Sequence, residues 1–241
     1  MPFDESLAIA VIGVFFAGLS RGFSDFGAAL IVMPILSILY GPVPAVVMMT
    51  LMEVPATALL LPSFIRHANW GAVMPLGLAS LVTIPLGGWI LVSLDTEVLQ
   101  RSIAILVLIF AALLATGWRY RRPPTMPVML GVGGLSGLIG GAANMSGPLV
   151  VVFLLAGQNT AHQVRAGVMA YFSFSTLLRV AVYAWHGLYA VETLTLGAIL
   201  TLPYLIGIWV GSRLFRGVSD RAFRILVLSL VAVMGVAALL W

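Results

Sequence analysis

The chain has 241 residues, of which 61% are hydrophobic and only 8% are charged. Because soluble domains carry roughly a quarter of charged residues, this composition excludes a soluble globular protein and predicts an all-α polytopic membrane protein. The net charge of +4 comes from twelve arginines and no lysine against eight acids, and such an excess in a membrane protein sets orientation, so nucleic acid is not an expected partner. The absence of cysteine excludes disulfides and thiol catalysis.

The first half of the chain contains five apolar stretches, at about 6–20, 26–40, 44–65, 71–93 and 98–118. The opening "MPFDES" carries two acids and no basic residue, so the first stretch is predicted not to be a removable signal peptide. Each of the first two stretches reaches only ~22 Å as a helix, short of the ~30 Å hydrocarbon layer. They are therefore predicted to form a re-entrant helical hairpin, and the other three to be transmembrane helices.

Residues 20–27 form the predicted tip of this hairpin. A helix that starts at membrane depth offers unpaired N–H groups to an anion, and a guanidinium adds charge and a planar set of donors. The candidate substrate-binding residues here are Ser20, Arg21, Gly22 and Ser24. Either Ser24 or Asp25 is expected to cap the second arm. Asp25 is also a candidate coupling acid, and in the alternative interpretation it only neutralises Arg21 and holds the turn.

Further polar residues lie within or beside the predicted spans. Glu53 falls near mid-membrane, where a carboxyl must be protonated, paired or facing water, so it is the preferred proton-coupling acid. The alternative is a structural carboxyl bonded to a neighbouring helix. His67 and His186 are expected at the membrane interfaces, with a proton relay as the less favoured option. Arg179 is expected to snorkel toward the surface, and the less favoured option is that it attracts anions at an external mouth. Two serines that either bond their own backbone or line a cavity are Ser173 and Ser175.

The second half of the sequence repeats the first. A shift of 119 residues places Gly22 over Gly141 and Asp25 over Asn144, and with four extra residues Gly88 meets Gly211. A collinear series of such matches argues for duplication, with one repeat in 1–122 and the other in 123–241 of a single membrane domain. Because each repeat has three full spans, the second must insert upside down relative to the first.

Residues 140–148, "GGAANMSGP", form the predicted tip of the second hairpin. Its candidate substrate-binding residues are Gly141, Asn144 and Ser146, and Asn144 or Ser146 is expected to cap the helix that follows. Inverted symmetry is expected to bring the two tips together near the midplane. Two helix N-termini facing one point would make a site for a small anion.

The arginines predict the orientation. If the linker at 119–122 is cytoplasmic, nine of the twelve arginines lie on that side, and five acids with a single arginine lie on the other. This pattern predicts that both termini are outside.

The sequence contains no catalytic or metal-ligand pattern. It lacks HExxH, G-x-S-x-G and a P-loop lysine, and its three histidines are scattered. We therefore expect no enzyme activity, no metal and no cofactor.

The glycine-rich segments resemble those of the TauE/SafE-type sulfite exporter family. They read "AGLSRGFSDFGAALIVMPIL" and "GGLSGLIGGAANMSGPLVVVFLL", and "IPLGG" at 84–88 is a further shared piece. The resemblance covers nearly the whole chain and implies a multi-pass permease of the bacterial plasma membrane that moves sulfite or a small organosulfonate such as sulfoacetate. Asp25 and Asn144 depart from the family pattern, which often has glycine at these two places.

The combined prediction is a secondary transporter for a small anion, coupled to protons or to membrane potential. Its expected partners are that anion and the lipid bilayer, and the oligomeric state is open, with a dimer as one option. An anion channel or a cation permease, with Asp25 and Glu53 as ligands, is the first alternative. An intramembrane lipid-modifying enzyme is the second.

Overall fold

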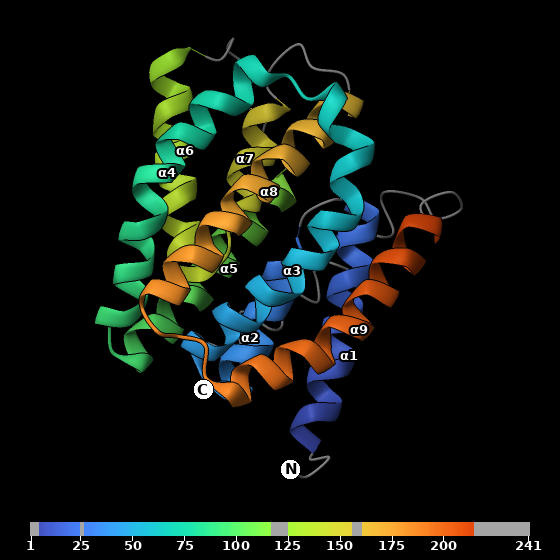
Figure 1. Cartoon of the computed structure of the whole chain (residues 1–241), viewed down its shortest axis with the longest axis vertical. Coiled ribbons are helices and arrows are strands. Elements are labelled where there is room, and N and C mark those ends of the chain that lie inside the picture. Colours follow the sequence, from blue (N-terminus) through green and yellow to red (C-terminus); the bar gives the residue numbers. More distant parts are fainter. Residues whose placement is uncertain (1–4, 25–26, 117–124, 156–160, 215–241) are drawn as a thin grey trace. The chain divides into compact units, whose positions relative to one another are not determined.

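The computed structural model describes residues 5–24, 27–116, 125–155 and 161–214 (Figure 1). The elements of this part of the chain are α1 (Glu5–Ser24), α2 (Ala28–Tyr40), α3 (Pro42–Phe64), the 3-10 turn η1 (Ile65–His67), α4 (Trp70–Ser93), α5 (Thr96–Thr116), α6 (Met126–Ala143), α7 (Gly147–Leu154), α8 (Ala161–Trp185) and α9 (Val191–Leu214). The all-α prediction is confirmed for these residues. Seven of the described helices are long and apolar enough to cross a membrane, namely α1, α3, α4, α5, α6, α8 and α9. The last predicted span of the second half lies outside the described residues.

The two arms of each predicted hairpin differ in length. The first arms, α1 and α6, have 20 and 18 residues and are long and apolar enough to span a membrane. The prediction that both arms are too short is therefore wrong for the first arms. The apolar stretch ends near Ser20, but α1 continues to Ser24 because helical hydrogen bonding does not require apolar side chains. The second arms, α2 and α7, have 13 and 8 residues and span only ~20 and ~12 Å.

The helices fall into two compact units, and each unit combines both halves of the sequence. The first unit contains α1, α2, the start of α3 up to Met52, α5 and α9. The second contains the rest of α3 from Glu53 onward, η1, α4, α6, α7 and α8. The compact units are thus different from the sequence halves 1–122 and 123–241.

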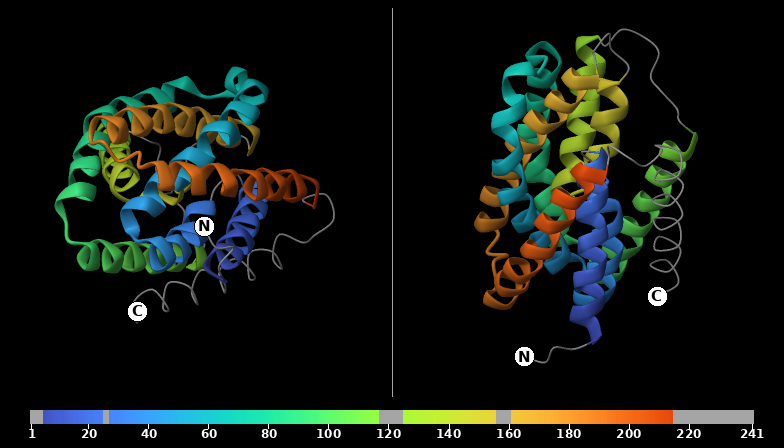
Figure 2. Two further views of the ribbon diagram at one scale, coloured as in Figure 1. Left: turned by 60° about the horizontal axis from the view of Figure 1, so that its bottom comes forward. Right: turned by 90° about the vertical axis from the view of Figure 1, so that its right-hand side faces the viewer.

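In the first unit, α1 packs parallel to α9 through glycines (Figure 2). Gly18 lies against the backbone of Tyr204, and Gly22, one turn later, lies against the backbone of Ile208. A Cβ at either glycine would come closer than 3.0 Å to α9 backbone atoms, which real side chains do not do, so the contact requires glycine. The α9 glycines that press on α1 in the same way are Gly207 and Gly211.

In the second unit, α6 packs parallel to α4 by the same means (Figure 1). Gly133, Gly137 and Gly141 follow one another at turns of α6 and lie against Leu76, Ser80 and Ile84 of α4, respectively. Helix α8 packs on α4 and η1, and α7 packs on α6 and α8. The turn between α6 and α7 therefore lies among helices of its own unit.

The glycine contacts of the two units correspond residue by residue. A shift of 119 residues carries Gly22 to Gly141, and a shift of 124 carries Ile84 to Ile208. In both units the glycine faces the carbonyl oxygen of the isoleucine. The two units thus use one packing pattern, as duplicated segments would.

This correspondence corrects one pairing taken from the sequence. Gly87, rather than Gly88, occupies the position of Gly211, because both Gly87 and Gly211 face a leucine carbonyl on the partner helix. Gly88 instead faces Val182 of α8. Between the two aligned regions, the second half therefore has five more residues than the first, rather than four. Sequence matching alone cannot choose between these numbers, because Gly87 and Gly88 are adjacent.

Gly137→Val is expected to destabilise the protein, because a Cβ at this position would lie 2.7 Å from the Cα of Ser80. Gly131 lies on the same helix, and a Cβ added there would meet nothing within 4 Å, so Gly131→Val is the matched control for the helix propensity of valine. We expect Gly137→Val to lower the free energy of unfolding by about 1–3 kcal/mol more than the control. Thermal unfolding in detergent measures the difference, and equal losses would contradict the packing account.

Candidate functional site

The turn between α6 and α7 is fully described. Helix α6 ends at Ala143, and Asn144 follows with a φ of 55°, its backbone N–H donating to the carbonyl of Gly140. Asparagine tolerates this left-handed conformation better than most residues. Asn144 therefore caps the C-terminus of α6. Of the two residues predicted to cap the next helix, Asn144 or Ser146, only Ser146 stands at the N-cap position.

Helix α7 begins at Gly147 directly after Ser146, with Pro148 in its first turn. Ser146 occupies the predicted N-cap position but makes no side-chain capping hydrogen bond. Its Oγ is buried and has no hydrogen-bond partner within the described residues, and the same holds for the Oγ of Ser136 on α6. Two buried hydroxyl groups, one at the turn and one on α6, thus make no hydrogen bond to the described residues.

Helix α8 presents a stripe of polar side chains at four-residue spacing. Tyr171, Ser175, Arg179 and Tyr183 are each at most 1% exposed. The hydroxyl of Tyr183 donates to the carbonyl of Gly141, 2.8 Å away, and so satisfies one of the carbonyls left over at the end of α6. This stripe therefore faces the end of α6.

Arg179 lies against the α6–α7 turn. Its Nη2 donates to Oγ1 of Thr176 over 3.0 Å. Its Nη1 would lie 3.4 Å from a Cβ placed on Gly140, and the Oγ of Ser146 would lie 3.3 Å from the same point. The expectation that Arg179 snorkels to the surface is wrong. Its side chain is 1% exposed, and its guanidinium lies beside Gly140 at the turn.

Tyr171 connects this cluster to α4. Its hydroxyl lies 2.9 Å from Oγ of Ser80, and that Oγ lies 2.8 Å from the carbonyl oxygen of Leu76 and 2.9 Å from that of Gly133. The Ser80 hydroxyl has one proton, and it must donate this proton to the carbonyl oxygens, which can only accept. The hydroxyl of Tyr171 therefore donates to Oγ of Ser80. The side chains of Arg179, Ser136 and Ser146 lie near the Tyr171 oxygen, so this oxygen faces the same cluster.

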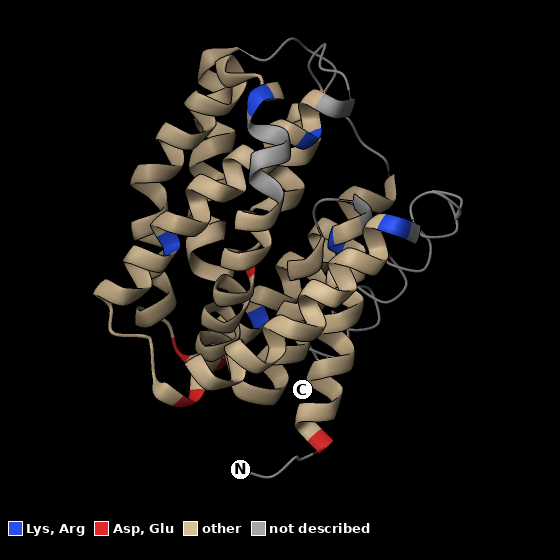
Figure 3. Cartoon of the chain, turned by 45° about the vertical axis from the view of Figure 1, so that its right-hand side comes forward, with Lys and Arg blue, Asp and Glu red and all other residues tan. Residues whose placement is uncertain are grey.

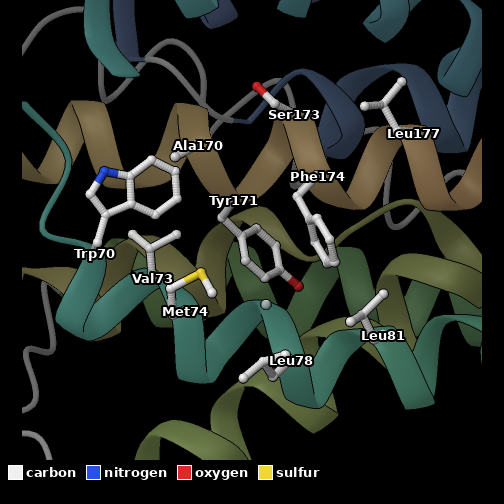
Figure 4. Close-up of a pocket in the computed structure, with 11 residues that line it drawn as sticks. Trp70, Val73, Met74, Leu78, Leu81, Ala170, Tyr171, Ser173, Phe174 and Leu177 are labelled. Atoms are coloured by element: carbon white, nitrogen blue, oxygen red, sulfur yellow. The ribbon is translucent and has the colours of Figure 1, made fainter. Parts of the chain in front are cut away.

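An apolar pocket of about 240 Å³ lies between α4 and α8 (Figure 4). Tyr171 crosses from α8 toward α4 beside Phe174, whereas Ser173 points the other way. The remaining lining is largely carbon, including Trp70 and Met74, and it contains no charged side chain to attract an anion. Tyr171 thus lines this pocket with its ring and contacts Ser80 with its hydroxyl.

The first hairpin buries the other predicted residues. Ser20 and Arg21 are 1% and 2% exposed near the end of α1. The residue that caps α2 is Gly27, with a φ of 92° and no side-chain bond, whereas Ser24 is the last residue of α1, so the expectation that Ser24 caps α2 is wrong. Asp25 lies outside the described residues.

The structure gives Gly22 and Gly141 a packing role, since each faces the backbone of a neighbouring helix. Their part in substrate binding stays a prediction. Glu53 is 3% exposed on α3, which agrees with a position inside the protein. Ser173 and Ser175 donate to backbone carbonyls of their own helix, as one of the two expectations has it.

Arg179 belongs to the polar cluster at this turn, whereas the sequence favoured a surface position for it. A signal is present in "YFSFSTLLRVAVY", where polar or aromatic hydroxyl residues recur every four positions around the arginine. Helical residues at this spacing share one face, so the pattern indicates a buried polar face rather than a snorkelling side chain. Among the described residues, no three His, Asp or Glu side chains come together as a metal-binding group.

Comparison with known proteins gives one family. The model of the family described as "Sulfite exporter TauE/SafE" matches residues 10–238, nearly the whole chain. Neither the curated proteins nor the solved structures gave a match. The chain, with its apolar helices and the glycine contacts of α1 with α9 and of α6 with α4, belongs to the TauE/SafE sulfite exporter family of membrane transporters.

Proposed function

We propose that the protein is a secondary transporter that carries a small sulfur oxyanion, sulfite or an organosulfonate such as sulfoacetate, across the bacterial plasma membrane. The observation that carries the proposal is the family match over residues 10–238. It is supported by the burial of two arginines, Arg21 and Arg179, inside apolar helices. Charged side chains at membrane depth are costly and usually belong to a transport pathway.

The anion is proposed to bind at the hairpin turns. At each turn one helix ends and a short second arm begins, so the first N–H groups of α2 and α7 have no acceptor within their own helix. These groups carry the positive end of the helix dipole and favour an anion. Hydroxyl groups of Ser20 and Ser146 and the amide of Asn144 add neutral donors.

The two halves are proposed to be inverted repeats. The matching glycine contacts of α1 with α9 and of α6 with α4 support a duplication. The short second arms support hairpins that return within the membrane, since α2 and α7 are too short to cross it. Glu53, a buried acid on α3, is the proposed coupling residue, with Asp25 as a second acid near the first turn.

A thermal-shift screen of the purified protein tests the proposal. Sulfite, sulfoacetate, thiosulfate, sulfate and simple carboxylates are added at equal ionic strength, and a ligand that binds only the folded state raises the melting temperature. Stabilisation by sulfite or a sulfonate, and not by carboxylates, is expected. A melting temperature that none of the sulfur compounds raises would contradict the proposed substrate class.

The proposed orientation places both termini outside. In the first unit, α1, α5 and α9 each carry an acid in the first turn, Glu5, Glu97 and Glu192, whereas Arg213 lies in the last turn of α9. Figure 3 shows that most charged residues lie near helix ends, with long uncharged stretches between them. Such a separation of acids from bases follows the positive-inside rule.

Cysteine labelling tests this orientation, because the natural sequence has no cysteine to remove. Glu5→Cys and Thr125→Cys are compared in intact cells with an impermeant maleimide. We expect Glu5→Cys to react from outside and Thr125→Cys to react only after the cells are opened. Labelling of both positions from the same side would contradict the topology.

A further inference from the structure

We infer that the turn between α6 and α7 is an oxyanion site in its own right, with Arg179 as its cationic ligand and the hydroxyl groups of Ser136 and Ser146 as its neutral donors. The inference rests on the proposed function and names the residues and the chemical group that the second hairpin recognises. None of these residues is supplied by the first unit. The group recognised is the SO₃ end of a sulfonate or of hydrogensulfite.

The first step is the charge. Arg179 is 1% exposed, and a guanidinium stays protonated in a protein. Between Glu97 and Glu192 the sequence contains no aspartate or glutamate, so α6, α7 and α8 carry no carboxylate of their own. The only acid that the second unit contains is Glu53 on α3. Helices α6, α7 and α8 therefore bring the positive charge of Arg179 to this point and no carboxylate of their own.

The second step is the number of donors. The Oγ atoms of Ser136 and Ser146 are buried and make no hydrogen bond within the described residues. A buried hydroxyl without a partner costs free energy that an acceptor would recover. Tyr171 gives its proton to Ser80, so its oxygen acts as an acceptor that positions the cluster rather than as a donor to a ligand.

The third step is the helix that starts at this point. Helix α7 begins immediately after Ser146, so its first N–H groups point back toward the turn. The buried Ser146 hydroxyl lies at the N-terminus of α7. The guanidinium of Arg179 and this hydroxyl both lie beside Gly140. The site thus combines one cation, two hydroxyl donors and a helix N-terminus. Such a set suits a ligand whose SO₃ end accepts hydrogen bonds and carries a single negative charge.

The fourth step is a comparison with the first hairpin. The shift of 119 residues that aligns α1 with α6 places Arg21 over Gly140. In the second hairpin the backbone therefore has a glycine where the first has an arginine, and the guanidinium of Arg179 lies beside that glycine instead. Each hairpin thus has one buried arginine at this aligned position or beside it. In the first hairpin the arginine belongs to α1, and in the second it belongs to α8.

Ligand-dependent thermal shifts of the purified full-length protein test the inference. The probes are sodium sulfite and sodium methanesulfonate, with sodium sulfate as a divalent comparison at equal ionic strength. Arg179→Gln is expected to weaken the apparent affinity for sulfite and methanesulfonate by at least about tenfold, because a charge-assisted bond is lost. Arg179→Lys is expected to recover part of that loss, since it keeps the charge but not the planar fork.

Gly140→Ala provides a second variant that leaves the arginine in place. Its Cβ would lie 3.2–3.4 Å from Ser146 and from Nη1 of Arg179, so it displaces both groups slightly. Gly131→Ala on the same helix meets nothing within 4 Å and is the matched control. We expect weaker binding in Gly140→Ala and unchanged binding in Gly131→Ala.

The outcomes separate this inference from the proposed function. If the natural protein binds neither probe, the proposed substrate class fails. If it binds them and Arg179→Gln binds equally well, the second-hairpin site fails while the proposed function stands. Should Arg179→Gln not fold, an unchanged affinity in Gly140→Ala and in Ser146→Ala overturns the inference.

Discussion

Arg21→Ala is expected to reduce binding of sulfite on the order of 100-fold or more. The guanidinium is 2% exposed near the end of α1, so its charge is not screened by bulk water and acts strongly on a nearby anion. Arg21→Lys should recover only part of the affinity, because an ammonium group cannot make the paired, planar contacts of a guanidinium. Ligand-dependent thermal shifts in detergent measure both variants.

Arg101→Ala is the matched control for the loss of a positive charge. Arg101 forms an ion pair with Glu97 one turn earlier on α5, and both side chains are largely exposed. Exposed pairs of this kind contribute little, so sulfite binding should stay unchanged. Equal affinity in Arg21→Ala and Arg101→Ala, with both proteins folded, would restrict Arg21 to a structural role.

Glu53→Gln is expected to keep substrate binding and to abolish the response of transport to a pH gradient. Glu53 is 3% exposed on a helix that is long enough to span the membrane. A charged carboxyl in such a place is expensive, so its gain and loss of a proton can be tied to the conformation that reaches water. Glutamine keeps the shape of the protonated acid and removes the exchangeable proton.

The measurement is sulfite flux in liposomes with and without an imposed pH gradient. Glu192→Gln, at the exposed start of α9, removes a carboxyl of the same kind outside the protein interior and should leave the pH response intact. A Glu53→Gln protein whose flux still follows the pH gradient would place coupling at another residue or assign transport to membrane potential alone.

Much of the fold follows from the composition. The apolar stretches locate the helices, because a polar backbone inside a membrane must satisfy its hydrogen bonds within each segment. The length of α1 cannot be predicted from the composition, since the apolar stretch ends near Ser20 whereas the helix continues to Ser24. The correspondence of Gly87 with Gly211 also cannot be predicted from the sequence. Gly87 and Gly88 are adjacent, and only the structure shows which of them contacts the backbone of the neighbouring helix.

The site is predictable only in part. Its proposed location at the glycine-rich turns comes from the sequence repeat, and Arg21, Asn144 and Ser146 are buried, as that proposal requires. The polar residues at four-residue spacing around Arg179 indicate a buried face, but they do not tell which element this face contacts, and Gly140 lies 39 residues earlier in the chain. Only the packing of α8 on its unit brings the two together.

The central claim is that this chain moves a small sulfur oxyanion, and sulfite flux in liposomes that contain only the purified protein tests it most directly. The account predicts a flux that saturates with sulfite concentration, exceeds that of protein-free liposomes, and falls when methanesulfonate competes. A flux equal to that of protein-free liposomes, from protein that is folded and inserted, would contradict it.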